Sequence, residues 1–149
     1  IMTQAENIMA GGFDLDQLDK QAEEVLHKVV VVSDIDGEDK CGFFITSKNS
    51  PEYQEAARQV RIDGLKRSAK RKSTLDTSTD EGAGVVAKMI EANEMTLACA
   101  VVKGWFGFQS GGAEAPFQKA SVAKMFAKFP TWKDKVTAAL ENEANFLKG

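Results

Sequence analysis

The residues of this chain that could carry out catalysis are few. His27 is the only histidine among 149 residues, and Cys41 and Cys99 are the only cysteines. A serine–histidine triad would have to use His27, and a zinc site would need clustered cysteine and histidine ligands. Instead, His27 lies at the end of a predicted helix, and both cysteines fall in apolar patterns typical of reduced thiols in a protein core. The sequence therefore predicts no enzyme, no bound metal and no cofactor.

Two other segments resemble ligand-binding motifs without matching them. Asp34, Asp36 and Gly37 are arranged as in part of a calcium loop. An EF-hand, however, has its glycine at the sixth position of the loop and a glutamate at the twelfth. In this chain the glycine comes three residues after Asp34, and the twelfth position is Ile45. The glycine-rich segment 104–112 lacks the Lys-Ser/Thr pair of a nucleotide-binding P-loop. We interpret the acids as turn residues and the glycines as sharp bends around bulky aromatic side chains.

A run of basic residues forms a candidate binding surface, and three interpretations of it are open. Seven cations lie between Arg58 and Lys72, opposed only by Asp63. They could meet phosphates, form a solvated helix face, or meet the acidic face of a predicted helix over 13–27 in another copy. The net charge of −3 and the lack of interleaved aromatic residues make nucleic acid an unlikely partner. The candidate residues are Arg61, Lys66, Arg67, Lys70 and Arg71.

The first part of the chain combines a helix pattern with strand patterns. Residues 1–12 carry no pattern and are expected to be a flexible start. Residues 13–149 are long and apolar enough for a single domain. It begins with an N-terminal helix over 13–27, followed by a β-hairpin over 28–47 with an Asp-Gly turn. Because two strands alone are marginal in water, the hairpin must pack on helices or pair with another copy.

Helix patterns dominate the rest of the domain. Ser50 and Pro51 begin a basic helix over 51–72, and the polar residues 73–80 are predicted to be a linker. The apolar stripe of the basic helix consists of Tyr53, Ala57, Val60 and Leu65. A helical C-terminal part follows over 81–147, and its first helix is expected to begin at a capping box of Ser78 and Glu81.

The helical C-terminal part contains three predicted helices. The first is strongly apolar and reaches Lys103, and a loop follows over 104–115. A short helix over 117–129 is ended by Pro130, and Thr131 is expected to cap the last helix. The predicted fold class is therefore α+β, mainly α-helical with one β-hairpin near the N-terminal third. No apolar run approaches the roughly 20 residues that span a bilayer, and no signal peptide is visible, so an intracellular protein is expected.

The order of five segments carries a resemblance to a known family. These are the hairpin Val29–Ile45, the helix start Ser50–Tyr53, the apolar helix that leads to Trp105, the helix start Pro116-Phe117 and the ending Asn145-Phe146-Leu147. In this order and spacing the chain resembles the tail assembly chaperones of long-tailed bacteriophages. One local departure is Phe106-Gly107-Phe108, where the family has a polar residue.

The resemblance implies a non-enzymatic protein in the cytoplasm of the infected bacterial host. Such chaperones bind and solubilise the tape-measure protein, help tail-tube subunits to polymerise around it, self-associate, and are absent from the finished particle. Many are also made in a longer, frameshifted form. The alternative is a structural tail or neck subunit that forms rings. A nucleic-acid-binding regulator is a weaker alternative, and no membrane partner is expected.

Aromatic residues of the last third are a second candidate surface. A groove that receives a partner helix would be lined by such side chains, but an ordinary core would use them equally. The candidates are Trp105, Phe106, Phe108, Phe117 and Trp132.

Overall fold

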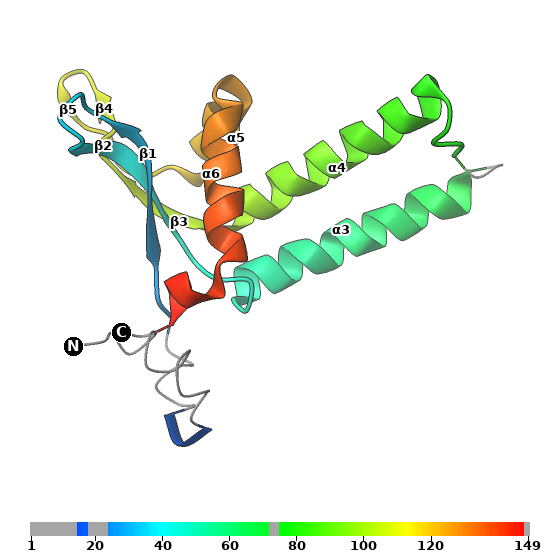
Figure 1. Cartoon of the computed structure of the whole chain (residues 1–149), viewed down its shortest axis with the longest axis horizontal. Coiled ribbons are helices and arrows are strands. Elements are labelled where there is room, and N and C mark those ends of the chain that lie inside the picture. The colour runs from blue at the N-terminus through cyan, green and yellow to red at the C-terminus, as the bar shows by residue number, and fades with distance from the viewer. Residues whose placement is uncertain (1–14, 18–23, 72–74, 148–149) are drawn as a thin grey trace.

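The computed structural model describes residues 15–17, 24–71 and 75–147, and Figure 1 shows its elements. The elements are η1 (Leu15–Gln17), β1 (His27–Ser33), β2 (Asp39–Ile45), α3 (Pro51–Lys70), α4 (Asp80–Val101), β3 (Val102–Phe106), β4 (Gln109–Ser110), β5 (Ala113–Glu114), α5 (Lys119–Lys128), α6 (Pro130–Glu141) and η2 (Glu143–Phe146). The fold is α+β and mainly helical, as predicted. Within the described part, no helix has the length and apolar character needed to cross a membrane.

The predicted hairpin is present and belongs to a larger sheet. β1, β2 and β3 form an antiparallel sheet in that order, with Val29 opposite Phe43 and Phe43 opposite Trp105. At the edge, the pairing of β1 shifts register between Val30 and Val32, and the Lys135 ammonium donates to the Val31 carbonyl over 3.1 Å. A bulge and a lysine are devices that keep an edge strand from pairing with another chain. The hairpin is therefore stabilised within its own chain.

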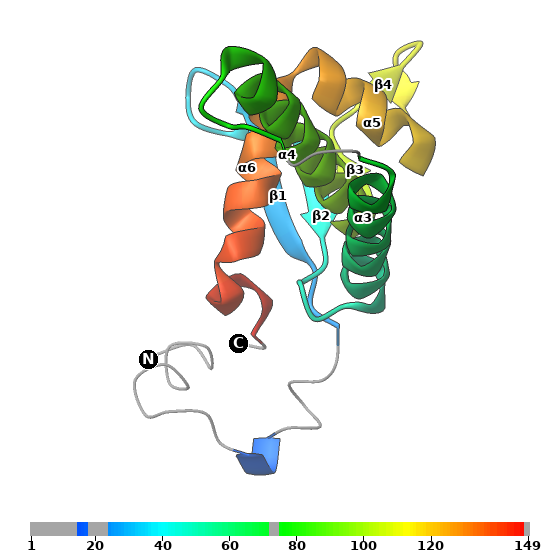
Figure 2. The ribbon, with the colours of Figure 1, turned by 90° about the vertical axis from the view of Figure 1, so that its right-hand side faces the viewer.

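One face of the sheet carries the core. Helices α5, α6 and the last turn of α4 pack on this face (Figure 2). The alternate residues Val29, Val31, Cys41, Phe43 and Ile45 of β1 and β2 point toward it, because successive side chains of a strand point to opposite faces. Phe43 is fully buried, and the Phe126 ring of α5 meets it edge-on at 5.3 Å. The buried aliphatic residues around them are Val29, Val31, Ile45, Ala98, Val101, Val102, Val122, Val136 and Leu140.

Helices α3 and α4 run antiparallel and project from the sheet as an arm (Figure 1). Ser50 caps α3 as predicted, because its hydroxyl accepts the Tyr53 backbone N–H over 3.2 Å. No residue of α3 is buried. Leu65, which was placed in the apolar stripe, is 71% exposed. The arm consequently leaves much of its helical surface open.

The N-terminal helix predicted over 13–27 is wrong at its C-terminal end. His27 is the first residue of β1 and pairs with Ile45, while residues 24–26 have no regular structure. Pairing with β2 satisfies the His27 backbone in place of helical bonds. A 3₁₀ turn covers Leu15–Gln17. The predicted flexible start at 1–12, and most of the remaining helix, lie outside the described residues.

Two boundaries of α4 also differ from the prediction. Thr79 is the cap, since its hydroxyl accepts the Gly82 N–H over 3.0 Å. Ser78 instead donates its hydroxyl to Asp76 over 2.6 Å. At the other end the helix stops at Val101, and the apolar pattern through Lys103 continues as β3 because these residues pair with β2.

The C-terminal segments contain further departures. Phe129 lies between α5 and α6, and Pro130 is the first residue of α6. Thr131 therefore lies inside α6 and does not cap it. Pro130 is tolerated as the first residue of the helix because the N–H groups of the first turn have no helical partner. The segment 104–115, predicted to be a loop, contains the last three residues of β3 and the small β4–β5 hairpin. Positive φ angles at Gly111 (61°) and Gly112 (82°) form its turn.

Candidate partner-binding surfaces

Four of the five predicted aromatic residues meet in one group, called here the aromatic cluster: Trp105, Phe108, Phe117 and Trp132. Ring centroids lie 5.4 Å apart for Trp105–Phe108, 5.1 Å for Trp105–Phe117 and 5.8 Å for Phe108–Trp132. Phe43 of the core anchors the cluster, at 5.3 Å from Phe108 and 6.3 Å from Trp132. Trp105, Phe108 and Trp132 are partly buried against the core. These three side chains therefore hold β3 and the following loop onto α6.

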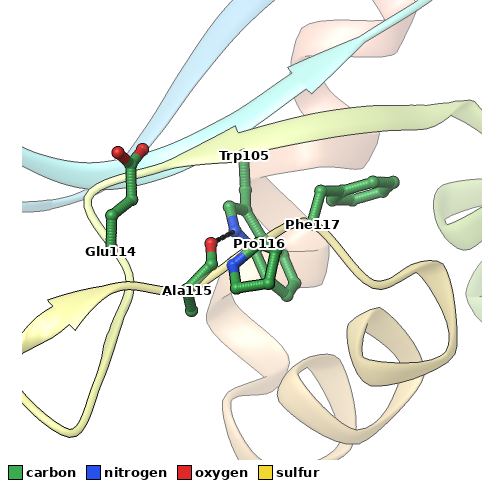
Figure 3. Close-up of a pocket in the computed structure, with 5 residues that line it drawn as sticks. All are labelled: Trp105, Glu114, Ala115, Pro116 and Phe117. Atoms are coloured by element: carbon green, nitrogen blue, oxygen red, sulfur yellow. Dashed lines mark hydrogen bonds between the residues drawn. The ribbon is translucent and has the colours of Figure 1, made fainter.

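Phe117 lies at the rim of the aromatic cluster, beside a small pocket. The pocket has a volume of about 230 Å³, and Figure 3 shows its lining. The Trp105 indole N–H donates to the Ala115 carbonyl over 2.9 Å, which fixes the loop against the ring. Phe117 is 36% exposed, and the Glu114 carboxylate points away from the Trp105–Pro116 pair (Figure 3). The pocket can accept one apolar side chain.

Phe106 is separate from the aromatic cluster. It follows Trp105 in β3, so its side chain points to the opposite face of the sheet. There it packs at 5.6 Å from the Phe44 ring. The Lys28 ammonium lies 4.6 Å from the Phe106 ring centroid and 3.0 Å from an Asp39 carboxylate oxygen. Phe106 thus contributes to a partly exposed patch on the outer face.

The predicted basic residues lie on α3, in the arm. Arg61, Lys66, Arg67 and Lys70 are exposed, and within the described ranges none of them forms an ion pair. Arg71 differs, because it is half-buried and its Nη2 lies 3.3 Å from the Met89 sulfur of α4. Four cations are therefore available to a partner, while the fifth helps to join α3 to α4.

A charged cluster that the sequence did not reveal fixes the base of the arm. Lys103 of β3 donates to a Glu52 carboxylate oxygen over 2.6 Å and lies 3.7 Å from Glu24. Its hydrogen bond lowers the pKa of Glu52, and the same bond raises the pKa of Lys103. The Thr46 hydroxyl also donates to Glu24 over 3.2 Å. The cluster joins segments up to 79 positions apart in sequence, which is why local patterns did not predict it.

The titratable groups with catalytic potential do not converge. Burial lowers the pKa of His27, and its ring packs edge-on at 5.9 Å from Phe146. Burial raises the pKa of both Cys41 and Cys99, which keeps these free thiols protonated. Among the described residues no group of three or more His, Cys, Asp or Glu side chains could hold a metal ion.

Exposed apolar side chains are a further feature that the sequence analysis did not single out as a site. Ile35 in the β1–β2 turn is 100% exposed, and Leu65 and Ile90 on the arm are 71% and 53% exposed. A sequence signal existed for two of them: Ile35 stands alone within an acidic turn, and Leu65 stands within the basic run.

In comparisons with protein-family models, curated proteins and solved structures, nothing matches this chain.

Proposed function

We propose that this chain is a non-enzymatic tail assembly chaperone. In this role it binds the long helical tape-measure protein in the cytoplasm of the infected bacterium and keeps it soluble while the tail is built. Tail-tube subunits and further copies of the chain are additional proposed partners. The resemblance in segment order supports the proposal, and the arm supports it independently of that resemblance.

The observation that carries the proposal is the open helical surface of the arm. α3 spans 20 residues without one buried residue, and α4 leaves Val85 and Ile90 exposed. Large apolar side chains that gather on one surface commonly mark an interaction site, and Val85 and Ile90 lie on the same helix. An antiparallel pair of helices can accept a third, amphipathic helix along its surface. A tape-measure helix of that kind would cover Val85 and Ile90, the large apolar residues that α4 leaves exposed.

A second contact is available at the pocket beside Phe117. Aromatic side chains in a partly enclosed site are frequent anchors in protein interfaces. Trp105 is fixed by its hydrogen bond to the Ala115 carbonyl, so the pocket is formed before a partner arrives. We assign it a secondary role, because it has room for only about one side chain at 230 Å³.

The alternative of a ring-forming tail or neck subunit has less support. A ring built by hairpin pairing would use the free edge of β1. That edge carries the register shift around Val31, and the Val31 carbonyl already accepts the Lys135 ammonium. Both features disfavour the addition of a strand.

The direct test is co-expression with the tape-measure protein of the same phage, followed by light scattering on the eluted complex. We expect soluble tape-measure protein carrying several copies of this chain. Replacing Ile90 on the arm (Ile90→Ser) should weaken this binding about tenfold, as loss of one interface anchor does. Val32→Ser is the matched control, because Val32 is also exposed, at 38%, but lies on the sheet. A tape-measure protein that stays insoluble, or equal effects of the two variants, would refute the proposal.

A further inference from the structure

Two highly exposed apolar side chains stand on opposite sides of the molecule. Ile35 is 100% exposed in the turn between β1 and β2, and Leu65 is 71% exposed on α3. The turn lies at the end of the sheet that faces away from the arm (Figure 1). One chain therefore cannot bring the two side chains together, although a second copy can.

The turn that carries Ile35 is held in one shape and is acidic. The Asp34 carboxylate accepts the backbone N–H groups of Asp36 and Glu38, each over 2.9 Å. Gly37 supplies the positive φ of 83° that the turn requires. In the described part of the chain, Asp34, Asp36 and Glu38 form no ion pair. The turn thus presents one apolar side chain beside the exposed carboxylates of Asp36 and Glu38, while the Asp34 carboxylate is bound by the turn's own backbone.

The surface around Leu65 has the opposite charge. Arg61 lies one helical turn before Leu65 on the same face, since residues four apart are neighbours on a helix, and Lys66 lies at the edge of that face as the next residue along the chain. Both cations are exposed. The other side of α3 packs on α4, where Arg71 contacts Met89. Leu65 is therefore an apolar centre with cations beside it, directed away from the arm's own interior.

We propose that the acidic turn of one copy docks on the basic face of α3 in a second copy, with Ile35 against Leu65. Both surfaces of this contact are present in one chain: each has an exposed apolar side chain, and their charges are opposite. Oppositely charged rims steer association and select the partner. Because the two surfaces differ, the contact is heterologous, and it repeats from copy to copy in a head-to-tail series. This inference builds on the proposed function, in which a series of copies would follow one long helical partner.

The first experiment uses the purified chain alone, without a tape-measure protein. Sedimentation velocity at low ionic strength should show species that grow with concentration and shrink as salt is added, because salt screens exposed charges. Ile35→Ser and Leu65→Ser should each weaken association at least about tenfold. Ile90→Ser is the control: Ile90 is also exposed on the arm, and its loss should leave self-association unchanged. Circular dichroism would verify that all variants remain folded.

Mixing the variants tests the head-to-tail geometry. Ile35→Ser keeps an intact α3 face and Leu65→Ser keeps an intact turn, so an equimolar mixture should form a 1:1 dimer and nothing larger. A symmetric arrangement is distinguished by the wild-type chain, which would then stop at a dimer instead of growing with concentration.

Charge reversal tests the complementarity. The double variants Asp36→Lys/Glu38→Lys and Arg61→Glu/Lys66→Glu should each be monomeric alone. Their mixture should associate again, because every turn then meets an α3 face of opposite charge. A wild-type chain that stays monomeric, association that survives Ile35→Ser and Leu65→Ser, or reversed variants that fail to associate when mixed would overturn the inference. None of these outcomes involves the tape-measure protein, so a failure of this inference can be distinguished from a failure of the proposed function.

Discussion

Replacing Trp132 by alanine should destabilise the fold strongly, because the structure gives this residue a core role. Its ring stacks on Phe129 at 4.2 Å and lies 5.8 Å from Phe108 and 6.3 Å from Phe43. Truncation of a buried tryptophan costs about 3–5 kcal/mol. Trp132 is only partly buried, and its stacking partner Phe129 is 43% exposed. We therefore expect a loss at the lower end, about 3 kcal/mol.

Urea unfolding followed by far-UV circular dichroism measures this loss without using tryptophan fluorescence. Single domains have total stabilities of about 5–15 kcal/mol, so the variant should remain folded but with a clearly lower midpoint. At this chain length the melting temperature should fall by roughly 6–12 °C. The slope of the transition should not change, since the same surface is exposed on unfolding.

Phe117→Ala is the matched control for Trp132→Ala. Phe117 is 36% exposed, and among the described residues its ring contacts only Trp105. Its truncation should cost about 1 kcal/mol, well below the core range. The reasoning is refuted if Trp132→Ala loses less than about 1 kcal/mol while it abolishes tape-measure solubilisation. Trp132 would then belong to a binding groove.

Three smaller perturbations test individual contacts. Thr79→Ala should cost about 1 kcal/mol in urea unfolding and Ser78→Ala clearly less, because only the Thr79 hydroxyl caps α4. Glu52→Gln should lower the melting temperature at pH 7. Lys103 lowers the pKa of Glu52 in the folded protein. The Glu52 carboxylate therefore stabilises the fold above the ordinary glutamate pKa of about 4.3, and this contribution disappears as the pH falls through the lower pKa of the folded state. Below that pH the wild-type protein and Glu52→Gln should have the same melting temperature. A melting difference that persists at about pH 2 would contradict this assignment. Gly107→Ala should cost more than about 2 kcal/mol, since its φ is 79° and a Cβ would overlap a β2 carbonyl oxygen.

Elements with local signals were predictable from the sequence. The Asp-Gly pair placed the β1–β2 turn, and Ser50-Pro51 placed the start of α3. β3 was not predictable in this way, because Val102 and Lys103 continue the apolar pattern of the preceding helix. Their strand conformation depends on pairing with β2, which lies about sixty positions earlier in the chain.

The candidate site was predictable in its residue types but not in its layout. Aromatic content drew attention to five residues, and the structure brings four of them together, whereas their role in partner binding stays a prediction. Only the strand alternation of β3 shows that Phe106 points away from Trp105, and only tertiary packing shows that Phe43 anchors the others. Whether an aromatic side chain lies in a core or at a rim depends on non-local contacts, so composition could not distinguish the two.

The distribution of apolar residues separates stability from recognition. The body of the molecule buries its aliphatic residues between the sheet and α5–α6, and the aromatic cluster closes one side of that core. The arm does not need its outer surface for folding, since α3 contributes no buried residue. Substitutions on that surface should therefore change binding while they leave stability nearly unaltered. Ile90 and Leu65 can therefore be tested one at a time. We expect Ile90→Ser to reduce partner binding selectively and Leu65→Ser to reduce self-association selectively.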